Sequence, residues 1–189
     1  MSGELIKEKA YDLFAEKGYE GTSMSLIAEH VGIKKASIYS HFKGKKELYL
    51  QLYHEALEKE LAFIQSFFST EDVIEKQLYD FLLSSIERFE TDRELHFLLR
   101  QGFFPPAGLK DEMIKIFNQY VVMMEGRLES MLQEVVNEGK IDTDPKMASV
   151  AYVALLDSVY VELMYGEKKK AILRAESTWN LLWKGMSSK

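Results

Sequence analysis

Five lysines lie between His30 and Lys46 with no carboxylate among them, at positions 34, 35, 43, 45 and 46. Ammonium groups gathered in this way neutralise phosphate oxygens, which is the chemistry that nucleic-acid binding requires. Short hydroxyl side chains, such as Ser37 and Ser40, occur in the same stretch. Side chains of this size let a helix come close to the edges of DNA bases. On charge alone, the stretch also fits a solvated basic face.

The net charge of the whole chain, in contrast, does not favour nucleic-acid binding. Its 189 residues carry a formal net charge of −6, which by itself argues against a nucleic-acid partner. However, residues 1–50 carry eight lysines against seven acidic residues, whereas residues 51–189 carry sixteen basic and twenty-three acidic ones. The basic character is therefore local to the N-terminal part of the chain.

Residues 22–42 have the spacing of a helix-turn-helix. In the first helix, about residues 24–31, the apolar side chains of Ile27 and Val31 recur on one face. Gly32 follows, and glycine permits the left-handed turn that joins the two helices. A second helix over about 35–42 then directs outward a set of short or basic side chains: Lys35, Ala36, Ser37, Ser40 and His41. Such a helix enters the major groove with its N-terminal residues at the base edges.

Lys34 and Lys35 stand at the N-terminus of that second helix. The helix dipole disfavours cations there by a few tenths of a kcal/mol up to about 1 kcal/mol. A phosphate would compensate these charges and would also accept hydrogen bonds from the free N–H groups of the helix. Taken alone, the pair fits equally well two surface lysines that the fold tolerates.

Helical periodicity extends through the rest of the chain, and only three prolines, at 105, 106 and 145, interrupt it. No stretch alternates as a strand would, so the fold class expected is all-α. We expect a first helix that ends near Gly18, a break at 69–72 and a Pro-Pro break at 105–106. The longer helices are expected at about 45–68, 73–90, 91–100, 109–138, 145–165 and 168–185.

The expected organisation is a three-helix head at 1–46 on a larger helical body at 47–189. The chain has no cysteine, which excludes disulfides and thiolate metal sites. The N-terminus lacks the layout of a signal peptide. The longest purely apolar run, residues 150–156, is far shorter than the roughly 18–20 residues that span a bilayer. We therefore expect a cytoplasmic protein with no membrane partner.

Catalytic motifs are not apparent in the sequence. It has no glycine-rich phosphate loop, HExxH or nucleophile elbow, and none of the four histidines follows a glutamate by three residues. We expect neither an enzyme nor a metal or cofactor. The other alternative is a helical interaction module that never touches DNA, which a mobility assay at low salt distinguishes.

From about Ala10 to Leu52 the sequence resembles the tetracycline-repressor family of transcription regulators. The residues that carry the resemblance are Phe14, Gly18, Tyr19, Thr22, Ser23, Ile27, Ala28, Gly32, Ile33, Lys35, Ala36, Ser37, Ile38, Tyr39, His41, Phe42, Lys45 and Leu48. Two positions depart from the family pattern. Lys34 stands where a hydroxyl is usual, and Gly44 stands where a capping Ser, Asn or Asp is usual.

The resemblance implies base contacts by Ser25, Lys35 and Ser37. It implies phosphate contacts by Thr22, Tyr39, His41 and Lys45. With Lys34 and Ala36, the candidate DNA-binding set is Thr22, Ser25, Lys34, Lys35, Ala36, Ser37, Tyr39, His41 and Lys45. The resemblance further implies a repressor that binds double-stranded DNA as a homodimer at a near-palindromic operator. A small, largely apolar ligand would release this repressor from the DNA.

The body offers candidates for the pocket and the dimer interface that the resemblance implies. Aromatic, methionine and polar residues suggest a ligand pocket: Phe63, Phe67, Phe97, Arg100, Phe103, Phe104, Met113, Phe117 and Tyr120. Such residues at helical spacing are also typical of simple core packing. The last two helices carry more apolar surface than attachment to one body needs, which suggests a four-helix dimer interface built on Tyr152, Leu156, Val159, Leu163, Trp179, Leu182 and Trp183.

Overall fold

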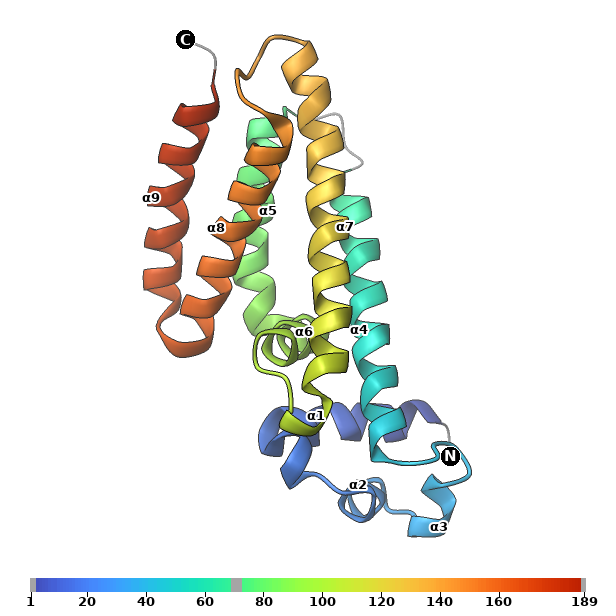
Figure 1. Cartoon of the computed structure of the whole chain (residues 1–189). Coiled ribbons are helices and arrows are strands. Elements are labelled where there is room, and N and C mark those ends of the chain that lie inside the picture. Colours follow the sequence, from blue (N-terminus) through green and yellow to red (C-terminus); the bar gives the residue numbers. More distant parts are fainter. Residues whose placement is uncertain (1–2, 69–72, 188–189) are drawn as a thin grey trace. The chain divides into compact units, whose positions relative to one another are not determined.

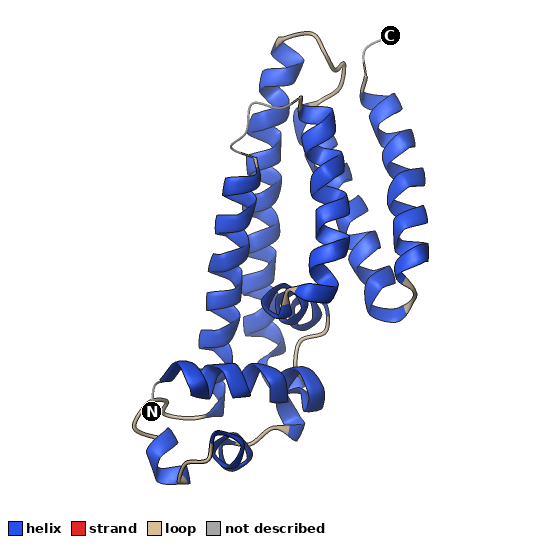
Figure 2. Cartoon of the chain, turned by 180° about the vertical axis from the view of Figure 1, so that it is seen from behind, coloured by secondary structure: helices blue, strands red, loops and turns tan. Residues whose placement is uncertain are grey.

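The computed structural model describes residues 3–68 and 73–187, and in these ranges every regular element is a helix (Figure 2). The elements are α1 Gly3–Gly21, α2 Met24–Val31, α3 Lys35–Ile38, α4 Lys45–Phe67, α5 Ile74–Thr91, α6 Arg93–Phe103, the 3-10 turn Ala107–Leu109, α7 Lys110–Asn137, α8 Pro145–Tyr165 and α9 Lys168–Met186. The one extended pairing in the described ranges is an isolated bridge between Ile141 and Ser187. The all-α prediction is confirmed.

The chain divides into two compact units (Figure 1). The first unit consists of Met1–Ala62 and Arg93–Met113, and the second unit of Phe63–Asp92 and Ile114–Lys189. The first unit thus contains the head together with most of α4 and all of α6. The functional boundary that we place between residues 46 and 47 stays a prediction, since packing units and functional domains are different divisions.

In the first unit, α1 packs against α2 and α6, and α2 packs against α3. Tyr11 ties α1 to α4, because its hydroxyl donates to the Leu52 carbonyl oxygen at 2.7 Å. Its ring meets the Phe97 ring of α6 edge to face, with 5.2 Å between centroids. Buried aromatic rings from three helices therefore form the centre of this unit.

In the second unit, α8 and α9 form an antiparallel pair that α5 covers (Figure 1). Asp144 caps α8 by accepting a hydrogen bond from the Met147 N–H at 2.8 Å, and Pro145 occupies the first turn, where proline is tolerated. The Tyr152 hydroxyl joins α8 to α5 by donating to the Leu78 carbonyl oxygen at 2.6 Å. By length and composition alone, α8 is also apolar enough to cross a membrane, but it packs in this unit with eight buried residues.

The element boundaries differ from the sequence expectations at three places. The first helix continues to Gly21 through a kink at Gly18, whose φ of 71° is open to glycine. The second helix of the head ends at Ile38 instead of Phe42, because residues 39–41 form turns. The sixth helix extends to Phe103 before the two prolines end it. The expected break at 69–72 lies outside the described residues.

Candidate nucleic-acid interface

The turn between α2 and α3 is closed by backbone hydrogen bonds. Ser23 caps α2, its hydroxyl accepting from the Leu26 N–H at 3.1 Å. Gly32 follows α2 with a φ of 74°, and its N–H donates to the carbonyls of Ala28 and Glu29. The Ile33 N–H adds a bond to the Ala28 carbonyl at 2.9 Å. This arrangement needs a left-handed residue after the helix, which explains the glycine.

Helix α3 is short but firmly anchored. Ile38 is fully buried and Phe42 is nearly so. The N–H groups of His41 and Phe42 both donate to the Ile38 carbonyl at 3.0 Å, which holds the turn that follows the helix. Apolar burial on one side of α3 therefore fixes which side chains face solvent.

Seven of the nine candidate DNA-binding residues lie on the exposed side of this region. Ser25, Lys34, Lys35, Ala36, Ser37, Tyr39 and His41 are all exposed, and Tyr39 keeps 47% of its surface accessible. Neither Lys34 nor Lys35 forms an ion pair within the described part of the chain, and Lys34 provides no side-chain cap. The result is an unpaired pair of cations beside short side chains at the start of α3.

Two candidates are engaged with the protein itself. Thr22 is buried, and its hydroxyl is shared between the carbonyls of Leu13 at 3.1 Å and Gly18 at 2.8 Å. The Lys45 ammonium donates to the Tyr19 carbonyl at 2.8 Å and lies 4.0 Å from the centroid of the Tyr19 ring. Thr22 thus stabilises the kink of α1. Lys45 uses one of its three ammonium donors on the protein itself.

The missing cap at Gly44 is replaced from within α4. The Glu47 carboxylate accepts a hydrogen bond from the Lys43 N–H, as a capping glutamate does. Lys46 is drawn into an ion pair with Glu112 at 2.6 Å. Among the lysines of the basic stretch, 34, 35, 43 and 45 therefore stand without an ion pair within the described ranges, and Lys45 is held by Tyr19 instead.

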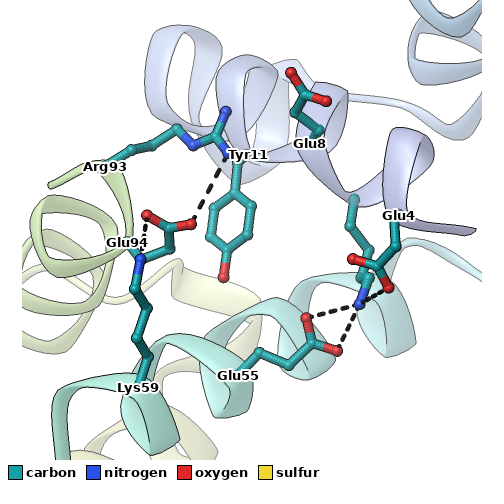
Figure 3. Close-up of a pocket in the computed structure, with 8 residues that line it drawn as sticks. Glu4, Glu8, Tyr11, Glu55, Lys59, Arg93 and Glu94 are labelled. Carbon is teal, nitrogen blue, oxygen red and sulfur yellow. Dashed lines mark hydrogen bonds and ion pairs between the residues drawn. The ribbon is translucent and has the colours of Figure 1, made fainter. Parts of the chain in front are cut away.

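A charged cavity of about 390 Å³ in the first unit was not predicted from the sequence (Figure 3). Lys7 joins α1 to α4 through Glu55 at 3.0 Å and also pairs with Glu4 at 2.6 Å. Burial disfavours the charge on Lys7, but the hydrogen bonds to Glu4 and Glu55 outweigh it, so the pKa of Lys7 lies above its ordinary value. The partners are 48 residues apart, and no local spacing reveals such a pair.

On the other side of this cavity, Glu94 of α6 lies between Arg93 and Lys59 (Figure 3). Arg93 also pairs with Asp12 of α1 at 3.0 Å. These are exposed ion pairs, each worth little, and their joint effect is to orient α1 on α4 and α6 within the first unit.

The candidate pocket residues are distributed over several aromatic groups. In the first unit, the Phe97 ring packs with the rings of Tyr11, Tyr49 and Tyr53. The ring centroids of Phe103 and Phe104 are 6.5 Å apart. Met113 is buried there, whereas Arg100 is exposed. In the second unit, Phe63 and Phe67 pack with Phe81, and Phe117 packs with Tyr120 at 5.8 Å. Their common role in a pocket stays a prediction.

The candidate dimer residues fall into two groups. Tyr152, Leu156, Val159 and Trp179 are buried within the second unit, where they form its own core. Leu163, Leu182 and Trp183 are partly exposed. The strongly exposed apolar side chains on α8 and α9 are Met147, Val150, Val161, Tyr165, Leu173 and Leu181. Helices α8 and α9 therefore expose apolar surface, and its use as a dimer interface stays a prediction.

Comparison with known proteins settles the nature of the head. Residues 6–52 match the family described as "Bacterial regulatory proteins, tetR family". This likeness concerns the N-terminal part of the chain, which contains the helix-turn-helix. The matched segment contains α2, α3 and every candidate DNA-binding residue, and the family resemblance deduced from the sequence is confirmed.

Proteins similar to this chain include regulators of a biofilm operon. The negative transcriptional regulator IcaR of Staphylococcus aureus (strain Newman) is 54% identical over 46 residues, which cover 24% of this chain and 25% of the relative. IcaR of Staphylococcus epidermidis is 33% identical over 108 residues, or 57% of each chain. The match thus spans about a quarter of the length of the S. aureus relative.

Solved structures extend the likeness in fold to the whole chain. FadR from Bacillus subtilis in complex with stearoyl-CoA has a TM-score of 0.72 at 20% identity and covers 97% of this chain and 99% of its own. The SmeT–triclosan complex has a TM-score of 0.72 at 19% identity, with 98% and 91% covered. At this identity the likeness shows that the body shares the fold of these regulators.

Proposed function

We propose that this chain is a DNA-binding transcription repressor that recognises a near-palindromic operator as a homodimer and is released by a small, largely apolar ligand. The observation that carries the proposal is the exposed face of α3, with unpaired Lys34 and Lys35 beside Ala36 and Ser37 in a tetR-family head. We assign it no catalytic role and expect it in the cytoplasm.

The chemistry of α3 supports a division of labour on DNA. Lys35 and Ser37 stand at the N-terminal end of the helix, which is the end that meets base edges in a helix-turn-helix. Lys34, Tyr39 and His41 flank these positions and are suited to phosphates, as a cation or as hydrogen-bond donors. Phosphate contacts set the register on the duplex, and base contacts set the sequence preference.

The repressor and ligand parts of the proposal are supported by what the similar proteins are named for. IcaR is a negative transcriptional regulator, and the FadR and SmeT structures hold stearoyl-CoA and triclosan. Both compounds have large apolar parts. The described body of this chain offers aromatic clusters in each unit that suit ligands of the same character.

The homodimer is supported by the apolar surface of α8 and α9. Tyr165 and Leu181 expose 72% and 74% of their area. A shallow hollow of about 250 Å³ beside Leu181 is lined by Met147, Ala148 and Ala151. Exposed apolar side chains of this kind favour a protein interface, and a two-fold axis would let both copies bury them at once.

A mobility-shift assay with the DNA upstream of the chain's own gene tests the proposal. We expect a shifted band at low salt and an affinity that falls steeply with salt, because bound phosphates release counterions. A scrambled duplex of equal length is the control and should bind far more weakly. If the two duplexes bind equally, or neither binds at low salt, the regulator assignment fails and the helical interaction module takes its place.

A further inference from the structure

Three tyrosines are buried to 1% exposure or less: Tyr49, Tyr53 and Tyr152. The Tyr49 hydroxyl donates to the Gln101 side-chain oxygen at 2.7 Å, and the Tyr152 hydroxyl donates to the Leu78 carbonyl at 2.6 Å. The Tyr53 hydroxyl has no hydrogen-bond partner among the described residues. A buried hydroxyl that gives up water without gaining a partner is unfavourable, so such groups are rare and each calls for an explanation.

Tyr53 lies one turn after Tyr49 on α4, and both rings contact Phe97 of α6. The centroid distances to Phe97 are 6.3 Å for Tyr53 and 5.5 Å for Tyr49. Two adjacent tyrosines therefore have the same aromatic neighbour but different polar surroundings. A phenylalanine at position 53 would pack against Phe97 equally well without burying a hydroxyl, so packing does not explain the tyrosine.

The chemical character of this hydroxyl restricts what it can bind. Burial raises the pKa of Tyr53 above its ordinary value, which keeps the hydroxyl protonated at neutral pH. A protonated phenol in an apolar environment is best satisfied by donating its hydrogen bond. Its partner must therefore offer an acceptor atom, of which a carbonyl oxygen is the commonest kind in small, largely apolar molecules.

We infer that Tyr53 is a ligand-binding residue whose hydroxyl donates to the carbonyl or other acceptor oxygen of a small, otherwise apolar molecule. The inference rests on the proposed function, because this molecule would be the ligand that releases the operator. It assigns the ligand's polar end to the first unit, which also contains α2 and α3. Tyr53 lies eight residues after Lys45, about 12 Å along the axis of α4.

The first test compares Tyr53→Phe with Tyr49→Phe in thermal unfolding of the full chain without ligand. Tyr49→Phe removes a formed hydrogen bond and leaves Gln101 without its partner, so its Tm should fall. Tyr53→Phe should keep the parent Tm or raise it. A Tm that falls equally in both variants would show that the Tyr53 hydroxyl already has a partner in the free protein, which overturns the inference.

The second test uses two probes of similar size and shape, acetophenone and ethylbenzene, at equal millimolar concentrations. Acetophenone has an acceptor oxygen and ethylbenzene has none. We expect acetophenone to raise the Tm of the parent and of Tyr49→Phe, and to bind Tyr53→Phe about five- to tenfold more weakly. Ethylbenzene should not distinguish the parent from Tyr53→Phe. The inference is contradicted if acetophenone does not raise the Tm of the parent, or if it raises the Tm of Tyr53→Phe by the same amount.

Neither test uses DNA, so the two proposals fail separately. If the parent chain does not bind its operator but acetophenone binding still requires the Tyr53 hydroxyl, the regulator assignment fails and the ligand site stands. If operator binding is found but acetophenone binds the parent and Tyr53→Phe equally well, the regulator assignment stands and the ligand site fails.

Discussion

The two surfaces proposed for partners have opposite characters. Helix α3 of the first unit presents short and basic side chains, whereas α8 and α9 of the second unit present large apolar ones. Base recognition depends on donors at fixed positions, while an apolar interface depends mainly on area. A surface of the first kind is specified by residue spacing, and a surface of the second kind tolerates many choices of residue.

This difference predicts that the largest effect of a single substitution comes from the apolar surface. Leu181→Glu would place a charge in the proposed dimer interface while leaving the protomer intact, because Leu181 is 74% exposed. We expect a monomer and a loss of operator affinity of about a hundredfold or more, since two linked heads bind far better than one. Light scattering measures the mass, and mobility shift measures the affinity.

The matched control is Val122→Glu on α7, which adds the same charge at an exposed apolar position outside α8 and α9. It should keep the mass and affinity of the parent chain. If Leu181→Glu folds normally and still forms a dimer, the proposal that α9 is part of the interface is wrong.

On α3 the expected effects are smaller and depend on position. Lys35→Ala or Ser37→Ala should cost about 1–3 kcal/mol of operator binding and relax the preference at one base pair. Lys34→Ala should weaken binding to all sequences alike and lower the salt slope by about one. Titrations against single-base operator variants at several salt concentrations separate the two patterns.

Lys115→Ala, an exposed lysine on α7, serves as the control for lost charge and should change neither quantity. If Lys35→Ala and Lys34→Ala behave alike, the division between base and phosphate contacts on α3 is wrong, although DNA binding by the head would survive.

The same contrast explains how far the sequence alone predicts this molecule. The helix-turn-helix follows from local rules, because Ser23, Gly32 and Ile38 each act within a few residues of their own position. The helices of the body follow from periodicity and from Pro105, Pro106 and Pro145. What spacing does not reveal is which face of an apolar helix is covered. In α8, Tyr152 and Val159 are buried while Val150 and Val161 are exposed, although all four are apolar.

Some features of the site depend on contacts distant in sequence. The sequence suggests Thr22 and Lys45 as phosphate contacts, but it does not show that the Thr22 hydroxyl is bonded to Leu13 or that Lys45 reaches Tyr19. Nor can the sequence predict the Lys7–Glu55 ion pair or the Tyr53 hydroxyl that lacks a hydrogen-bond partner, because both depend on tertiary structure. Residue type predicts the chemistry available, and only the fold decides where that chemistry is used.

The smallest expected effect concerns a carboxylate in the second unit. Burial, with a further contribution from the charge of Glu125, raises the pKa of Asp157 to about 6 from an ordinary 3.8. The folded state therefore binds a proton more tightly than the unfolded chain does, so this group stabilises the fold at low pH and loses that contribution as the pH rises from about 4 through 6. Asp157 is not fully buried, and solvent screening keeps the effect modest. Asp157→Asn should remove it: between pH 4 and 7 the Tm of the parent should fall relative to that of the variant. Parallel Tm curves for the two proteins across this range would show that burial does not raise the pKa of Asp157, and would contradict this prediction.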